Sequence, residues 1–156
     1  MLSQDQQYIE MSKRREILAG LLGASIAVVV WLTVLGRDPI HSNSLQFQPF
    51  HSFLSLGNEI RDYGLRGNLF GNILLFLPMG FLYTGSFMRE WKRTLLFGFC
   101  ISLLIEIAQL TFQRGYFEVD DLICNTIGTG IGYLTYRLMM WITTKLNRNK
   151  IAGENK

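Results

Sequence analysis

The segment TLLFGFCISLLIEIAQLTF, residues 94–112, carries a single charged side chain, Glu106, in an otherwise apolar or weakly polar run. A helix needs about 20 mainly apolar residues to cross the ~30 Å hydrocarbon core of a bilayer. The segment therefore predicts a transmembrane helix, and the chain holds further segments of this kind on both sides of it. The sequence thus predicts an all-α integral membrane bundle of four transmembrane helices. The other three segments are residues 17–35, 69–87 and 122–143.

The composition agrees with a membrane protein. Only 17% of the 156 residues are charged, against about 25% in typical soluble chains. The net charge of +3 is small, and the basic residues flank the apolar runs rather than forming one stripe. We therefore expect no nucleic-acid partner and instead expect contact with an anionic membrane surface.

The sequence predicts no metal site, disulfide or cofactor. Cys100 and Cys124 both lie inside apolar segments, where a cysteine usually packs as a small apolar residue. His41 and His51 share a loop without the spacing of metal ligands. The two cysteines are therefore interpreted as packing residues and the two histidines as exposed loop residues.

The segments define the organisation of the chain. Residues 1–16 are predicted to form a cytoplasmic N-terminal segment, residues 17–144 the four-helix membrane domain, and residues 145–156 a basic cytoplasmic tail that frays. The first apolar run is longer than the roughly 7–15 residues usual in a signal peptide. We therefore interpret it as a retained anchor.

The long connection between the first two helices, residues 36–67, alternates apolar and polar residues over residues 45–62. This pattern is typical of a segment whose apolar side enters the headgroup region of a bilayer. The sequence predicts either an interfacial or re-entrant amphipathic segment here, or an ordinary loop packed on the helix ends.

Lys and Arg residues divide unequally between the two ends of the predicted bundle, ten against four. Cytoplasmic ends of membrane helices are enriched in Lys and Arg, so both termini are predicted to be cytoplasmic. The ten are Lys13, Arg14, Arg15, Arg89, Lys92, Arg93, Lys145, Arg148, Lys150 and Lys156, and the four are Arg37, Arg61, Arg66 and Arg114.

Polar side chains recur on one face of the third predicted helix. Ser102, Glu106, Gln109 and Gln113 follow one another at spacings of four, three and four residues. Such spacings place them along one face, which should point at other helices rather than at lipid. A charged residue inside a membrane costs about 2.5–3.5 kcal/mol on insertion scales, so Glu106 is a candidate functional residue.

The fourth predicted helix carries a matching face formed by Asp121, Asn125, Gly128 and Gly132. Gly128 and Gly132 have the GxxxG spacing that lets another helix approach closely. A proline inside a helix removes a backbone hydrogen bond, so Pro78 should bend the second helix. The residues predicted to serve helix packing are Pro78, Gly80, Gly128 and Gly132.

The second helix starts at the end of the bundle where the third ends and the fourth starts, because successive crossings alternate in direction. Polar residues near these helix ends should share the outer leaflet, with Arg114 as a counter-charge for the carboxylates. They either satisfy one another and set the helix register, or form a pocket open to the outer surface. The predicted binding cluster consists of Asn72, Glu106, Gln109, Arg114, Asp120, Asp121 and Asn125.

These residues resemble the motifs of the VanZ-like family. The run from Asn72 to Gly80 is similar to its N-x-x-x-F-x-P-x-G signature, and Ser102 to Gly128 resembles its second block, S…E-x-x-Q…R…D-D-x-x-x-N-x-x-G. The element QFQPF departs from the family's N-L-x-P-F, because Gln46 replaces the usual Asn. The resemblance spans roughly residues 45–133. It implies a multipass protein of the bacterial cytoplasmic membrane, in a family named for a glycopeptide-resistance protein whose founding member is associated with teicoplanin resistance.

The predicted function is a non-enzymatic envelope protein that binds membrane lipid, a lipid-linked cell-wall precursor headgroup or an envelope protein at the cluster, and so lowers susceptibility to teicoplanin. The alternative is an intramembrane enzyme that uses Glu106 and Asp121 as an acid/base pair on a lipid-linked or phosphorylated substrate. No nucleophile–base pair or phosphate loop is visible, so no catalytic residue is predicted. A transporter subunit is a third hypothesis, weakened because the polar faces stop midway.

Overall fold

The structure is a computed structural model, and it describes residues 4–36, 45–46, 63–88, 90–115 and 117–154. The described chain is mainly helical, with four long helices and a π-helical turn, η1, that continues the first helix. Two short strands pair in parallel. The elements are α1 (Gln4–Val30), η1 (Trp31–Leu35), β1 (Leu45–Gln46), α3 (Tyr63–Phe87), α4 (Trp91–Thr111), β2 (Phe117–Glu118) and α5 (Val119–Glu154).

Three of the helices are long and apolar enough to cross a membrane. They occupy Gln4–Leu35, Leu69–Phe87 and Trp91–Thr111. Helix α5 has the length but not the hydropathy, because Asp, Asn, Thr and Gly residues occupy much of its first half. The prediction of transmembrane helices thus holds for three segments, and a fourth span remains a prediction.

The strand pairing and the ends of the long helices depart from the sequence prediction. The predicted all-α fold lacks the two-stranded sheet that the structure contains. In this sheet Leu45 pairs with Phe117 and Gln46 with Glu118. A pairing this short carries no periodicity that a sequence can display. Residues 146–154, predicted to fray, are helical, because α5 continues to Glu154. The predicted interfacial or re-entrant segment lies outside the described residues apart from Leu45–Gln46.

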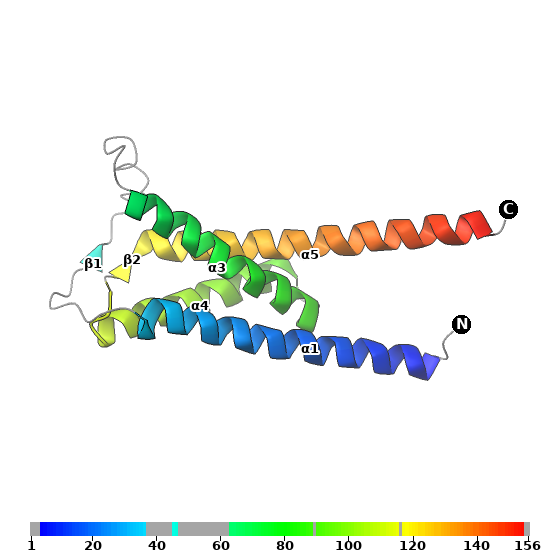
Figure 1. Cartoon of the computed structure of the whole chain (residues 1–156), viewed down its shortest axis with the longest axis horizontal. Helices are drawn as coiled ribbons and strands as arrows, with labels where there is room; N and C mark the ends of the chain where they lie inside the picture. Colours follow the sequence, from blue (N-terminus) through cyan, green and yellow to red (C-terminus); the bar gives the residue numbers. More distant parts are fainter. Residues whose placement is uncertain (1–3, 37–44, 47–62, 89, 116, 155–156) are drawn as a thin grey trace.

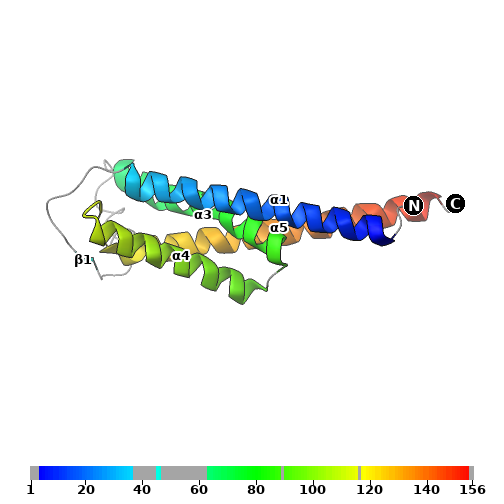
Figure 2. The ribbon, with the colours of Figure 1, turned by 90° about the horizontal axis from the view of Figure 1, so that it is seen from below.

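The helices pack around α3 and α5. These two make the most extensive contact, α1 lies along α3, α4 lies along α5, and η1 reaches α4 (Figure 1, Figure 2). The sheet sits where α4 ends and α5 begins, and we call this the sheet end of the bundle. At the opposite, terminal end, α1 and α5 extend beyond α3 and α4 and carry both chain termini.

Glycines permit the close contact between α3 and α5. A Cβ atom on Gly80, Gly128 or Gly132 would overlap a backbone carbonyl of the facing helix. Pro78, also predicted as a packing residue, is exposed, and α3 runs through it as a continuous helix. The carbonyls that face the three glycines belong to Thr129, Ile73 and Leu77 respectively.

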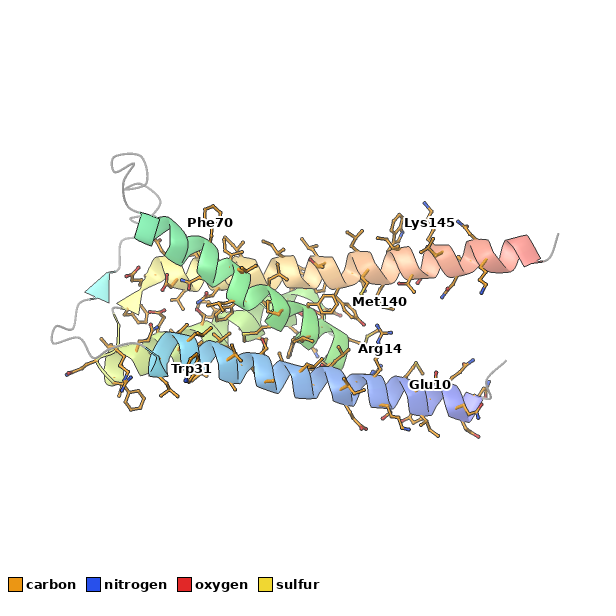
Figure 3. The ribbon with its side chains drawn as sticks, viewed as in Figure 1. Glu10, Arg14, Trp31, Phe70, Met140 and Lys145 are labelled. Carbon is orange, nitrogen blue, oxygen red and sulfur yellow. The ribbon has the colours of Figure 1, made fainter. Side chains whose placement is uncertain are left out.

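The outer faces of the helices are apolar while polar groups are buried. Phe70 points away from the bundle and is 72% exposed (Figure 3). Leu74 on α3 and Leu134 on α5 are exposed as well. Exposed apolar side chains over such a wide surface are typical of contact with lipid. A small apolar core fills the space among α1, α3 and α4, formed by Leu22, Val29, Val34, Phe76, Met79 and Ile105.

Candidate functional site

The polar face of α4 points into the bundle. Glu106 is 1% exposed and Gln109 is buried too, whereas their neighbours Leu104 and Ile107 are exposed. The helical repeat explains this division, since residues three and four apart share a face. Burying a carboxylate or an amide is unfavourable without hydrogen-bond partners, so the contacts of this face decide its role.

Asn125 joins α5 to α4. Its Nδ2 donates a hydrogen bond of 2.8 Å to Ser102 Oγ, and both side chains are buried. One turn further along α5, Thr129 Oγ1 donates to the Asn125 carbonyl at 2.9 Å. The Ser102 and Asn125 pair thus places the polar faces of α4 and α5 directly against each other.

Glu106 connects α4 to the sheet. Its Oε2 accepts the backbone N–H of Glu118 in β2 at 3.0 Å. The next residues after β2 enter the first turn of α5, where Asp120 is buried and Asp121 half-buried. Carboxylates in a first turn are stabilised by the helix dipole. Glu106, Asp120 and Asp121 therefore lie together where β2 passes into α5.

Gln109 and Arg114 bind the end of the first helix. Gln109 Nε2 donates to the Thr33 carbonyl at 2.9 Å, and Arg114 Nη1 donates to the Leu35 carbonyl at 2.8 Å. The last carbonyls of a helix have no partner within it. These two side chains supply partners, and so they tie η1 to the end of α4.

A left-handed residue ends α4 and places Arg114. Gln113 has φ of 54°, its N–H donates to the Leu110 carbonyl at 3.3 Å, and the Arg114 N–H donates to the Gln109 carbonyl at 2.9 Å. These two bonds form a Schellman motif, which usually has glycine at the left-handed position. Gln113 is exposed there and does not join the buried polar face predicted for it.

Two amide oxygens in the site have no hydrogen-bond partner among the residues that the structure describes. Gln109 Oε1 and Asn125 Oδ1 are buried, and neither accepts a hydrogen bond in the described part of the chain. Gln109 lies one turn beyond Glu106 on α4, and Asn125 binds Ser102 one turn before it. The site thus presents hydrogen-bond acceptors on both sides of a buried carboxyl group.

The structure places the predicted cluster residues at the sheet end. Asn72 is buried on α3, one residue before Ile73, whose carbonyl faces Gly128. Asn72 thus lies beside the same stretch of α5 as Asn125. Sequence reasoning missed the backbone partners at Thr33, Leu35 and Glu118, because a peptide group carries no signal in the sequence. The cluster residues placed at this end are Asn72, Glu106, Gln109, Arg114, Asp120, Asp121 and Asn125.

The structure is that of a helical membrane protein with an internal polar site. It has helices able to cross a bilayer, apolar outer faces and a buried polar cluster. The chain belongs to the VanZ/LLP1 family, whose sequence profile matches residues 20–140. It is similar to Protein VanZ of Enterococcus faecium, with 28% identity over 127 residues that cover 76% of this chain and 73% of the relative. No solved structure matches the chain. The family resemblance predicted from the motifs is confirmed.

Proposed function

We propose that this protein is a multipass protein of the bacterial cytoplasmic membrane whose buried polar cluster binds a lipid-linked headgroup or an envelope protein. Binding at the cluster would lower susceptibility to glycopeptide antibiotics such as teicoplanin. The observation that carries the proposal is the buried carboxyl group of Glu106 with two acceptors on either side of it, Gln109 Oε1 and Asn125 Oδ1, that no described residue satisfies. Helix packing alone gives no reason to bury acceptors without donors.

The proposal places four spans in the membrane, with α5 as the fourth and both termini in the cytoplasm. In the first half of α5, Asn125 is buried against Ser102 of α4, and Thr129 is buried against Gly80 of α3 and Gly98 of α4. These two polar residues therefore do not face lipid. Aromatic residues mark the interface at the terminal end, where Lys92 and Lys145 lie over the rings of Trp91 and Trp141. Trp and Lys in such positions are typical of a membrane–water boundary. The cluster at the sheet end then belongs to the outer leaflet.

Binding fits the contacts better than catalysis does. The Glu106 carboxylate accepts a backbone N–H, and Ser102 Oγ is held by an amide rather than by a base. A serine hydroxyl is a weak nucleophile unless an adjacent general base or a metal activates it. The acid/base role of Glu106 and Asp121 therefore has no observation in its favour, and we propose a binding protein.

The test compares teicoplanin susceptibility in a host that lacks its own copy. Empty vector, the wild-type chain, Glu106→Gln and Leu104→Ala are compared at equal abundance in the membrane. Leu104 is the matched control, because it lies on the exposed face of the same turn of α4. The proposal expects protection by the wild type and by Leu104→Ala but not by Glu106→Gln. Equal protection by all three chains would show that Glu106 has only a structural role. No protection by any of them would refute the role in resistance.

A further inference from the structure

We infer that the terminal end of the bundle holds one anionic phospholipid, with its headgroup in a basic groove along α5 and an acyl chain in an apolar groove between α4 and α5. This site lies at the opposite end of the molecule from the polar cluster and does not depend on what the cluster binds. In the orientation proposed above, the lipid belongs to the cytoplasmic leaflet.

The basic groove lies where α5 extends beyond α3 and α4, in the region of Met140 and Lys145 (Figure 1, Figure 3). It has a volume of about 660 Å³, and its lining includes the cations Arg137, Lys145 and Arg148 but no described carboxylate. Lys145 Nζ lies 5.0 Å from the centroid of the Trp141 ring, which also lines the groove. Cations gathered around one groove beside an interfacial aromatic ring are suited to an anionic headgroup.

The apolar groove lies between α4 and α5 and has a volume of about 380 Å³. Trp91 and Leu95 of α4 line one side, and Gly130, Tyr133 and Leu134 of α5 line the other. A Cβ atom on Gly130 would lie 3.1 Å from Leu95 Cδ2, so a larger residue there would crowd the groove. An apolar groove on a surface that faces lipid can accommodate a hydrocarbon chain.

The two grooves follow one another along the same face of α5. Leu134 precedes Arg137 by three residues, and Trp141 follows Arg137 by four. Side chains at these spacings are neighbours on one helix face. The face is apolar where α5 lies beside α4 and basic where α5 extends beyond it. A molecule that joins an apolar chain to an anionic headgroup matches this order, so the geometry favours a phospholipid over a soluble anion.

The charge of the whole terminal end also favours an anion. After Asp121, the sequence of α5 has no Asp or Glu before Glu154. The carboxylates placed at this end belong to α1 and to the residue before α4, and none of them lines either groove. Glu16 also accepts a hydrogen bond of 3.2 Å from Ser12. The described cations at this end are Lys13, Arg14, Arg15, Lys92, Arg93, Arg137, Lys145, Arg148 and Lys150, and the described carboxylates are Asp5, Glu10, Glu16 and Glu90.

A second copy of this chain fits the same face less well than a lipid does. If two copies packed through this face about a two-fold axis, the same surface would meet itself. Arg137, Lys145 and Arg148 would then lie near their own equivalents, and like charges repel. An anionic phospholipid brings the opposite charge to the same groups, so we assign both grooves to a lipid.

The test measures how strongly two lipids quench the fluorescence of a single tryptophan in the full-length chain. The chain has three tryptophans, of which Trp91 lines the apolar groove and Trp31 lies in η1 at the sheet end. Trp31→Phe with Trp141→Phe leaves Trp91, and Trp91→Phe with Trp141→Phe leaves Trp31 as the matched control. Each chain is reconstituted in phosphatidylcholine liposomes with rising fractions of phosphatidylglycerol or phosphatidylcholine that carry the same brominated acyl chains.

Two pairs of substitutions in the chain that retains Trp91 separate a binding site from general surface charge. Arg137→Gln with Arg148→Gln removes two cations from the basic groove, and Lys13→Gln with Arg14→Gln removes two cations from α1, outside both grooves. Glycerophosphoglycerol in excess offers the same headgroup without acyl chains. Circular dichroism checks that each chain remains folded.

Phosphatidylglycerol is expected to quench Trp91 with about tenfold higher relative affinity than phosphatidylcholine, because the groove cations attract a lipid of net negative charge. Trp31 should show no preference between the two lipids. The substitutions at Arg137 and Arg148 should abolish the preference at Trp91, whereas those at Lys13 and Arg14 should keep it. Glycerophosphoglycerol should leave the quenching unchanged.

Equal quenching of Trp91 by the two lipids would overturn the inference without any charge variant. An equal effect of the two pairs of substitutions would show a general attraction to the surface rather than a site. Displacement by glycerophosphoglycerol would assign the basic groove to a soluble phosphate compound, and protection of Trp91 from both lipids would assign the apolar groove to a second copy. Each of these results would contradict the lipid site and leave the proposed function of the polar cluster intact.

Discussion

The carboxylate of Glu106 and the backbone N–H of Glu118 are joined by a hydrogen bond of 3.0 Å, so a side chain inside α4 holds the strand that leads into α5. The strand in turn pairs with Leu45–Gln46 from the long connection after α1. Glu106 therefore has a structural contact at the same place where it contributes charge to the candidate site. Substitutions that separate these two roles are the most informative.

Replacing Glu106 should destabilise the sheet end according to what the new side chain can accept. Glu106→Leu removes the carboxylate that accepts the Glu118 N–H, and the loss of a hydrogen bond to a charged group should cost about 1–3 kcal/mol. Glu106→Gln retains an acceptor and should cost less. Reversible unfolding in mixed micelles, followed by circular dichroism, measures both. Equal destabilisation by the two variants would show that the Glu118 contact contributes little.

Removing the Gln109 amide should loosen the end of the first helix. Gln109→Leu leaves the Thr33 carbonyl without its donor, so amide exchange over η1 should become faster while exchange in the middle of α1 stays unchanged. Hydrogen exchange followed by mass spectrometry reports both regions. Ile107→Leu, on the exposed face of α4, is the control. Unchanged exchange at η1 in Gln109→Leu would contradict the capping role.

Replacing Gln113 with glycine should stabilise the protein. A non-glycine residue in the left-handed region costs about 1–2 kcal/mol, and glycine avoids this cost. Part of the gain is offset by the greater freedom of glycine in the unfolded chain, so a net gain of about 0.5–1 kcal/mol is expected. Thermal unfolding in detergent measures it. Gln113→Val should shift the midpoint downward, and a rise with valine would contradict the assignment.

Adding a methyl group to α3 should have opposite effects at two glycines. Gly80→Ala would place a Cβ against the Thr129 backbone and should destabilise the bundle by about 1–3 kcal/mol. Gly71→Ala meets nothing within 4 Å, so it should be neutral or stabilise α3 by up to ~1 kcal/mol. Unfolding midpoints of the two variants provide the comparison, and similar losses in both would contradict the close α3–α5 contact.

The sequence predicts the helices better than it predicts the hydrogen bonds that connect one helix to the next. The apolar runs locate α3 and α4 closely, and the spacing from Ser102 to Gln109 identifies a polar face that the structure buries. The alternation of helix direction also brings Asn125 to the end of the bundle that holds Glu106. These inferences succeed because periodicity is a property of side chains along one helix.

These connecting hydrogen bonds could not be predicted, because they use backbone N–H and carbonyl groups, which do not depend on residue type. The carbonyls of Thr33 and Leu35 are acceptors only because Trp31–Leu35 forms a helix end beside α4. Gln113 adopts the left-handed conformation although Gly115 stands two residues later, so residue type alone would misplace the turn. The apolar spacing of α5 likewise does not reveal that this helix continues to Glu154.

The capping of η1 has a consequence for how the protein is made. The Thr33 carbonyl receives its donor from a residue 76 positions later in the chain, and the Leu35 carbonyl from one 79 positions later. A ribosome delivers α1 to the membrane long before it has synthesised either donor. During that interval the Thr33 and Leu35 carbonyls lack the donors that Gln109 and Arg114 later supply. The closure of this helix end is therefore a late step of biogenesis, which follows the packing of α1 along α3 and waits for the tip of α4.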